Sequence, residues 1–169
     1  FAPKRAYAAT KDPVREFKDM VKTMHRLGIE VLMEFYFPEG CSPRYITECL
    51  QYWVQEYHVD GFHLMGDGVH QKVLEQDPIL YGTKKMFSEI AGNADTENML
   101  AEYNAGFKQD MRRFLKSDEG MISGAEFHVR RNTGSFGTIN YMANQDGFTL
   151  YDTVAYNYRH NEANGEDNR

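Results

Sequence analysis

A glutamate and a histidine stand inside apolar segments of this chain. Glu34 interrupts the most apolar stretch, Ile29 to Phe37. A buried carboxylate needs a polar partner, so we expect Glu34 at the mouth of a barrel rather than on a solvated face. His63 lies in a short apolar segment and could donate a hydrogen bond to a ligand or act as a general base. A structural histidine with its hydrogen bonds satisfied inside the protein is the alternative.

Other polar side chains follow apolar segments or fill loops. Asp67 lies between Gly66 and Gly68, which is typical of a turn, although a continuing strand would aim it in the same direction as the residue two before it. Gln145 and Asp146 follow an apolar segment and could bind a ligand or cap a turn. A polar run near the end of the sequence forms either a solvated loop or the rim of a binding site: Asn157, Arg159, His160, Asn161 and Glu162.

The first elements that must position these groups are a helix and a strand. Asp12 is a suitable N-cap, Pro13 suits the first helical position, and Gly28 supplies a C-terminal stop. The stretch Ile29 to Phe37 predicts a strand, and its nearly continuous apolar character predicts burial on both faces. Apolar residues recur at helical spacing before it: Val14, Phe17, Val21, Met24 and Leu27.

The same alternation continues along the chain. Pro43 opens a second helix, and Val59 to Met65 predicts the next strand. The apolar stripe of this second helix is Cys49, Leu50, Trp53, Val54 and Tyr57. Further strands are predicted over 84–90, 98–103 and 138–143, and residues 150–158 are helical or irregular. A helix that is broken near Gly120 is predicted to point four side chains inward: Phe107, Met111, Phe114 and Leu115.

Strands alternating with helices predict an α/β fold with a parallel sheet. A closed (β/α)8 TIM barrel needs roughly 250 residues, so 169 residues with about five strands predict an incomplete barrel. No change in composition marks a second domain. We therefore expect residues 1–169 to form a single partial β/α-barrel domain of a larger protein.

Composition excludes several classes of protein. The chain has 19 basic and 25 acidic side chains and a formal net charge of −6, which argues against binding to nucleic acid or to an anionic membrane. No apolar run approaches the ~18 residues that span a bilayer. Cys41 and Cys49 are too few for a disulfide scaffold, and no cluster of cysteine and histidine suggests a zinc site.

Several segments resemble motifs of one enzyme family. They lie at 1–7, 24–31, 59–62 and 110–114, and the most specific are 146–152 and 160–169, which read Asp-Gly-Phe-Thr-Leu-Tyr-Asp and His-Asn-Glu-Ala-Asn-Gly-Glu-Asp-Asn-Arg. Together they resemble the α-amylase superfamily of glycoside hydrolases, in its isoamylase, pullulanase and glycogen-debranching branch. The resemblance covers the chain from the end of the second barrel strand to beyond the seventh, so the strands present are about three to seven.

The resemblance implies retaining hydrolysis of α-glucosidic bonds, in which one carboxylate attacks the anomeric carbon and a carboxylic acid protonates the leaving oxygen. The family's nucleophile strand reads Gly-Phe-Arg-x-Asp, whereas this chain reads Gly61-Phe62-His63-Leu64-Met65. His63 therefore stands at the arginine position and Met65 at the nucleophile position. A thioether cannot form the glycosyl-enzyme bond of a carboxylate nucleophile.

This chain also differs from the family's motifs at other catalytic positions. The strand-three motif appears as Glu34 and Glu39, and the strand-seven motif His-Asp appears as Gln145-Asp146. Glu89 is the best candidate for the strand-five acid after a one-residue slip in the alignment. The resemblance implies no cofactor, and no calcium ligand set can be assembled from these residues.

Three functions compete at this point. The first is an inactive glycoside-hydrolase-like domain of a glycogen or starch debranching protein that at most binds α-glucan, and the second is an active α-glucosidic hydrolase with rearranged carboxylates drawn from Glu34, Asp67, Glu89 and Asp146. The third is a protein-interaction module that kept only the fold. Open sheet edges predict pairing with the rest of the parent chain or an edge-to-edge homodimer. The expected location is the cytoplasm, as for glycogen-type relatives, with secretion as the alternative.

Overall fold

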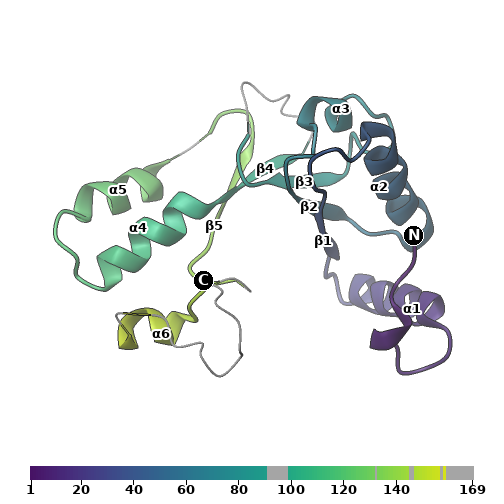
Figure 1. Ribbon diagram of the computed structural model, residues 1–169, viewed down its shortest axis with the longest axis horizontal. Coiled ribbons are helices and arrows are strands. Elements are labelled where there is room, and N and C mark those ends of the chain that lie inside the picture. The colour runs from purple at the N-terminus through teal and green to yellow at the C-terminus, as the bar shows by residue number, and fades with distance from the viewer. Residues whose placement is uncertain (91–98, 132, 145–146, 157, 159–169) are drawn as a thin grey trace. The chain divides into compact units, whose positions relative to one another are not determined.

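The computed structural model describes residues 1–90, 99–131, 133–144, 147–156 and 158 (Figure 1). The chain forms two compact units. The first unit contains Phe1–Glu102 and Ser135–Gly137, and the second contains Tyr103–Gly134 and Thr138–Arg169. The two units are described separately below.

The predicted first helix and its signals are present. A short 3-10 helix η1 (Arg5–Tyr7) precedes α1 (Pro13–Arg26). The side chain of Asp12 accepts a hydrogen bond from the backbone N–H of Arg15, as an N-cap should. After α1, Gly28 has a φ of 72°, a left-handed conformation that glycine adopts without strain.

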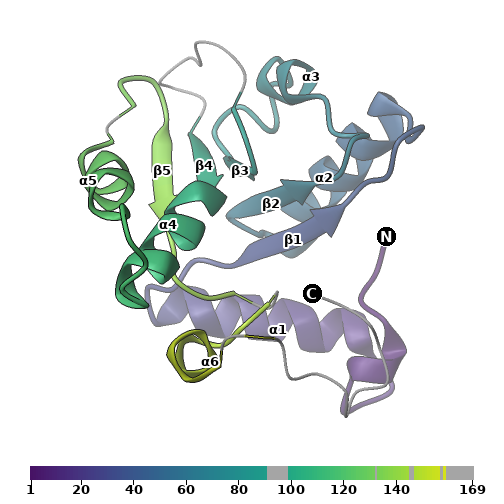
Figure 2. The ribbon, with the colours of Figure 1, turned by 60° about the vertical axis from the view of Figure 1, so that its left-hand side comes forward.

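Five strands form one sheet in the order β1-β2-β3-β4-β5. The first three pairings, from β1 to β4, are parallel. Figure 2 shows β1 and β2 side by side. Because spatial order follows chain order without a reversal, the sheet resembles part of a β/α barrel more than a doubly wound sheet. The strands are β1 (Leu32–Tyr36), β2 (Gly61–Met65), β3 (Lys84–Phe87), β4 (Leu100–Asn104) and β5 (Gly137–Asn140).

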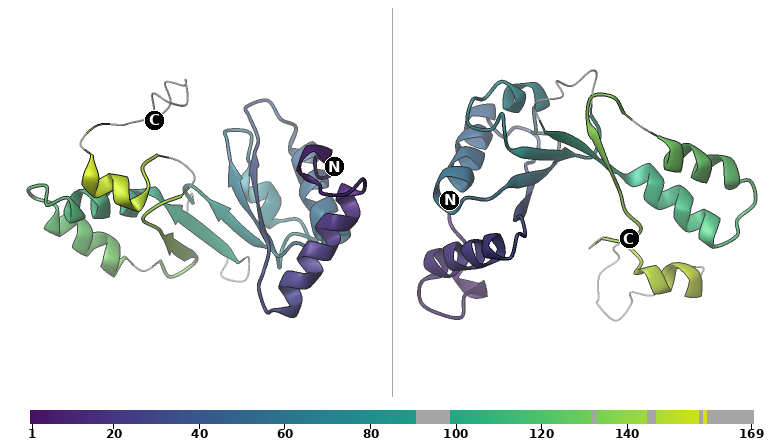
Figure 3. Two further views of the ribbon diagram at one scale, coloured as in Figure 1. Left: turned by 90° about the horizontal axis from the view of Figure 1, so that it is seen from below. Right: turned by 180° about the vertical axis from the view of Figure 1, so that it is seen from behind.

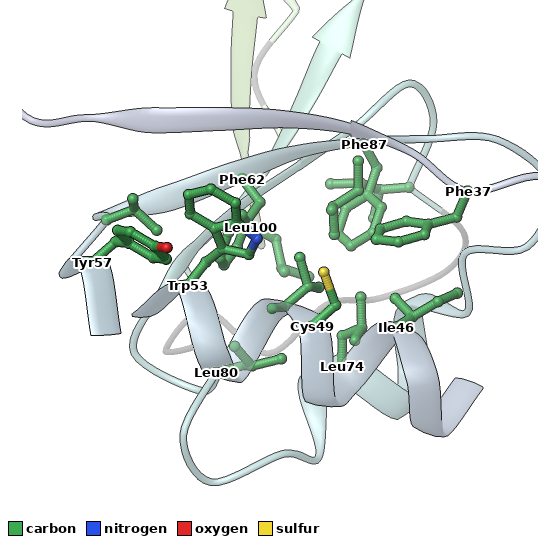
Figure 4. Packing of buried hydrophobic residues seen from close by; sticks show 14 residues of the cluster. Phe37, Ile46, Cys49, Trp53, Tyr57, Phe62, Leu74, Leu80, Phe87 and Leu100 are labelled. Atoms are coloured by element: carbon green, nitrogen blue, oxygen red, sulfur yellow. The ribbon is translucent and has the colours of Figure 1, made fainter. Parts of the chain in front are cut away.

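The α/β prediction is therefore confirmed, with strands somewhat shorter than the sequence predicted. The core of the first unit lies between the sheet and α2 (Pro43–Tyr57), as Figure 4 shows. Trp53 of this helix stacks on Tyr57 with ring centroids 4.4 Å apart, and Phe35 of β1 packs against it. The helix buries the stripe that its apolar spacing predicted: Ile46, Cys49, Leu50, Trp53 and Tyr57.

The prediction that the first strand is buried on both faces is wrong. Exposed and half-buried residues alternate along β1. Met33 and Phe35 pack against the core, whereas Leu32 and Tyr36 are 42% and 67% exposed. Successive side chains of a strand point to opposite faces, and α2 covers only one of them. The other face, which we call the open face, carries Leu32, Glu34 and Tyr36.

Two glycines shape the connection that leaves β2. Gly66 has a φ of 96°, and a Cβ atom there would lie 2.2 Å from the carbonyl oxygen of Phe37. A Cβ atom on Gly68 would lie 2.3 Å from the carbonyl oxygen of Pro38. The connection thus needs glycine at both positions, and it leads into the short helix α3 (Gln71–Glu75).

In the second unit, α4 (Ala105–Leu115) and α5 (Ile122–Arg130) lie side by side (Figure 3). The predicted break near Gly120 falls between them. The prediction that Phe114 and Leu115 point inward is wrong, because they are 41% and 49% exposed, at the last turn of α4. Phe107 and Met111 are half-buried. Residues 150–158 include one helix, α6 (Leu150–Ala155).

Candidate functional site

The open face of β1 and β2 brings together residues that the sequence singled out one by one. In the register of the sheet, Glu34 lies opposite His63, and Tyr36 lies opposite Met65. Side chains two residues apart on a strand share a face, so Glu34, Tyr36, His63 and Met65 lie on one surface. Tyr36 and Met65 are the last residues of their strands, at the end where β/α barrels place their functional groups, and Glu34 and His63 lie two residues before them.

Glu34 and His63 form a direct pair. The Nδ1 atom of His63 lies 2.8 Å from the Oε2 atom of Glu34. The histidine side chain is 9% exposed, whereas that of Glu34 is 42% exposed. A ligand on the open face would therefore meet the carboxylate first, with the imidazole fixing its orientation. The sequence predicted a polar partner for Glu34 but did not identify it, because the two residues are 29 positions apart and only the strand register joins them.

A cavity borders this pair on the side of the N-terminal segment. It measures about 710 Å³ and includes Glu34, Lys4, Tyr7 and Trp53 in its wall. Aromatic and polar side chains together are the usual lining of a small-molecule site. The cavity lies wholly within the first unit.

Met65 and Asp67 are separated by the end of β2. The strand ends at Met65, and the backbone N–H of Phe37 donates to the carbonyl oxygen of Met65 at 2.8 Å. The N–H of Gly68 donates back to the carbonyl oxygen of Phe37 at 3.1 Å. Asp67 therefore lies in an exposed turn rather than on a continuing strand.

Asp67 and Glu89 line the same second cavity. It measures about 660 Å³ and is lined by the end of β2, the connection to α3 and the residues that follow β3. Met65, Asp67, His70 and Glu89 all contribute to its wall. Asp67 and Glu89 are both exposed, so each carboxylate can meet a solute in this cavity.

Seven of the candidate site residues lie outside the part of the chain that the structure describes. These are Gln145, Asp146, Asn157, Arg159, His160, Asn161 and Glu162. Within the described ranges, no group of three or more histidine, cysteine, aspartate or glutamate side chains is arranged to hold a metal ion.

The sequence analysis missed a buried lysine in β3. Lys85 of β3 is 0% exposed, and its ammonium donates to the carbonyl oxygens of Leu80, Tyr81 and Thr83. Burial lowers the pKa of Lys85 to about 8, while the nearby charges of Glu75 and Asp77 oppose that shift. Lys85 thereby fixes the loop that enters β3, the strand that ends just before Glu89. A lysine in an apolar strand was the available signal.

A polar network in the second unit was also missed. Buried Asn104 at the end of β4 accepts a hydrogen bond from the N–H of Phe107, which caps α4, and donates to the Oδ1 atom of Asn140 at 3.0 Å. Its Nδ2 atom also lies 3.4 Å from the Nδ1 atom of His128, whose Nε2 atom is 3.4 Å from Asp110. This network joins two strands and two helices.

Among the helices that the structure describes, none is both long enough and apolar enough to cross a bilayer.

Comparisons with known proteins point to one group of relatives. The chain is 27% identical to a glycogen operon protein GlgX homolog of Haemophilus influenzae, over 100% of the chain and 36% of that protein. It is 29% identical to a glycogen debranching enzyme of Cronobacter sakazakii, over 96% of the chain and 36% of that enzyme. It is 27% identical to the chloroplastic isoamylase 3 of Oryza sativa, over 98% of the chain and 32% of that protein. No family model matches the chain, and no solved structure matches it.

These comparisons confirm the resemblance that the sequence motifs indicated. Over its whole length the chain is similar to isoamylase-type glycoside hydrolases of the α-amylase superfamily. Its relatives carry the names glycogen debranching enzyme and isoamylase. The chain spans about a third of the length of the curated relatives that it matches. One alignment extends over 244 positions although the chain has 169 residues, so the relative has residues without a counterpart here.

Proposed function

We propose that this chain is part of an isoamylase-type debranching protein and that it binds α-glucan without hydrolysing it. The observation that carries the proposal is Met65 at the end of β2, where the family resemblance places the nucleophile. A thioether sulfur is not a carboxylate, so it cannot form and release a glycosyl ester. Loss of a nucleophile typically lowers the rate by about six orders of magnitude, or about 8 kcal/mol of barrier.

The open face supports binding even though it does not support retaining catalysis. The Glu34 carboxylate can accept hydrogen bonds from sugar hydroxyl groups, and His63 holds it in place. Tyr36 is 67% exposed on the same face and offers an aromatic ring for the apolar side of a pyranose. Glu34 is thus the proposed contact residue, and His63 is a positioning residue.

The open face also supports an incomplete barrel. In the described sheet order β1 is an edge strand, and it exposes Leu32 and Tyr36 beside Glu34. An edge strand that carries exposed apolar side chains is suited to pairing with further strands. We propose that the remainder of the parent chain completes the barrel, and the alternative is an edge-to-edge homodimer. Sedimentation velocity on the parent protein distinguishes the two, since only the alternative predicts a dimer.

One observation favours a second candidate function, an active hydrolase with rearranged carboxylates. Asp67 and Glu89 line the same cavity as Met65, and an inverting glycosidase needs only an acid and a base about 6.5–9.5 Å apart. In that reaction one carboxylate would activate water and the other would protonate the leaving oxygen. The chain would then still hydrolyse α-glucosidic bonds, as the family resemblance implies, but with Asp67 and Glu89 as its catalytic carboxylates.

A paired assay on the full-length parent protein tests both candidates. Release of maltooligosaccharides from glycogen and pullulan is measured together with calorimetric binding of the same glucans. Binding without turnover is the expected result. Turnover that disappears in Glu89→Gln and Asp67→Asn, but persists in the matched exposed control Glu119→Gln, would establish the second candidate. Absence of both binding and turnover would leave the protein-interaction module.

The proposed location is the cytoplasm, and secretion is the alternative. The plant relatives are named as chloroplastic proteins, so location varies among the proteins that this chain resembles. Immunodetection of the parent protein in washed cells and in culture medium separates the two possibilities.

A further inference from the structure

Three partly exposed aromatic rings gather beside α2 in the first unit. Phe1 lies 5.5 Å from Tyr45 and 5.7 Å from Tyr52, measured between ring centroids. The three side chains belong to residues that are 47%, 50% and 38% exposed. Tyr52 also packs edge-on against the core residue Tyr57, with ring centroids 5.9 Å apart.

The two tyrosines are seven residues apart on α2, so they lie on one side of the helix and about 10 Å apart along its axis. Glu48 lies between them on the same side, and its carboxylate accepts a hydrogen bond from Arg44 at 2.7 Å. Both members of this ion pair are largely exposed. We call Phe1, Tyr45, Glu48 and Tyr52 the aromatic stripe.

The composition of the aromatic stripe favours a polyhydroxylated ligand over a protein surface. A protein partner would bury the Arg44–Glu48 ion pair, and removing an ion pair from water costs more than its attraction commonly returns. A sugar chain leaves that pair partly hydrated and offers hydroxyl groups to both members. Its pyranose rings present apolar C–H faces that can pack on the aromatic rings.

We propose that the aromatic stripe is a second α-glucan contact site, separate from the open face. The inference rests on the proposed α-glucan binding, and it adds a place where a longer or branched glucan makes contact. Neighbouring branches of one glycogen particle can then occupy both sites, and such double contact raises apparent affinity through effective concentration. A short linear oligosaccharide gains much less from the second site.

Calorimetric titration of glycogen and of maltoheptaose into the parent protein tests this site. Tyr45→Ala and Tyr52→Ala are each expected to raise the Kd for glycogen about fivefold, the effect of losing one aromatic contact of about 1 kcal/mol. Tyr45→Phe keeps the ring and is expected to retain the affinity. Tyr151→Ala is the matched control, because Tyr151 is an exposed tyrosine on another helix, and it should leave the Kd unchanged.

The outcomes separate this proposal from the proposed function. If Glu34→Ala weakens binding while both tyrosine variants bind as tightly as the unmodified protein, the second site is refuted and binding at the open face stands. If the tyrosine variants alter only the sedimentation coefficient, the stripe is a protein contact and the proposal is again refuted. If the unmodified protein binds neither glucan, both the second site and the proposed binding function are refuted. Melting curves by circular dichroism confirm that each variant is folded.

Discussion

A histidine pairs with a carboxylate on the open face of the first unit and again between helices of the second unit, and these two pairs differ in their surroundings. In the first unit, His63 lies 2.8 Å from Glu34 across two parallel strands. In the second unit, His128 lies 3.4 Å from Asp110, and these two residues come from α5 and α4. These two pairs therefore place the same functional groups on a sheet face in one unit and between helices in the other.

The surroundings decide what each pair can do. Glu34 is the more exposed member of its pair and lines a cavity of about 710 Å³. Asp110 instead lies where a Cβ atom on Gly124 would approach its Oδ2 atom to 2.6 Å, and a Cβ atom on Gly106 would lie 2.8 Å from the His128 ring. Glycines thus make room for the second pair inside the helix packing. The first pair thus has its exposed carboxylate beside a cavity, and the second pair lies where two helices pack.

We expect the largest effect from a substitution that breaks the hydrogen-bond network around the His128–Asp110 pair. Asn104→Ala removes the N-cap of α4. It also removes the amide that contacts Asn140 Oδ1 and His128 Nδ1, so it should lower the free energy of unfolding by about 3 kcal/mol. Urea unfolding measures the loss, and hydrogen exchange in α4 and α5 locates it. Asn104→Asp retains the cap oxygen and should recover part of the stability. Equal loss in both variants would contradict a capping role.

Lys85 differs from the two histidine pairs, because its buried ammonium donates hydrogen bonds to backbone carbonyl oxygens and to no carboxylate in the described contacts. Its folded pKa of about 8 is below the ordinary lysine value of 10.5, so the unfolded state binds more protons between these pH values. Stability should therefore rise with pH across this window, by up to about 3 kcal/mol from this group. Urea unfolding at pH 7.5 and pH 10 measures the change. Lys84→Met should retain the rise and Lys85→Met should remove it; a rise that survives Lys85→Met would assign it elsewhere.

A smaller effect separates the two pairs by function. Glu34→Ala should raise the Kd for maltoheptaose about tenfold, and it should also lower the free energy of unfolding by about 1 kcal/mol, because the buried His63 loses its carboxylate partner. Asp110→Ala should leave that Kd unchanged and lower the free energy of unfolding by about 1 kcal/mol, because His128 loses its partner. Calorimetry and urea unfolding on both variants give the comparison. The reverse pattern would exchange the roles that we assign to the two pairs.

The smallest expected effects concern the carboxylates of the second cavity. Asp67 lies in an exposed turn and Glu89 lies just past β3, so neither Asp67→Asn nor Glu89→Gln should change stability by more than about 0.5 kcal/mol. In an inactive protein neither substitution should change product release from glycogen, because none occurs. A loss of product release in either variant would show that the cavity is catalytic.

Local signals in the sequence predicted the elements well. Asp12, Pro13 and Gly28 bounded the first helix, and apolar spacing identified the stripe of α2 around Trp53. These signals act within a few residues of one another, so sequence reasoning can read them. The prediction that Ile29 to Phe37 is buried on both faces was wrong, because apolar character does not reveal how many faces of a strand are covered. In the structure α2 covers only one face of β1.

The candidate site was predictable only residue by residue. Glu34, His63 and Met65 each stood out in the sequence, but their common surface depends on strand register between segments far apart in the chain. Asn104, Asp110 and His128 gave no signal, because polar residues that follow a strand or lie on a helix are ordinary. The resemblance to debranching enzymes supplied what local physics could not, namely the position that a nucleophile would occupy.

The most direct test of the account is a single titration of maltoheptaose into the full-length parent protein, followed by analysis of the same sample for shorter oligosaccharides. We expect binding heat that is lost in Glu34→Ala and no shorter products after prolonged incubation. Shorter products that still form in the Met65→Leu variant and disappear in Glu89→Gln would contradict the account, because hydrolysis would then proceed through carboxylates that we regard as non-catalytic.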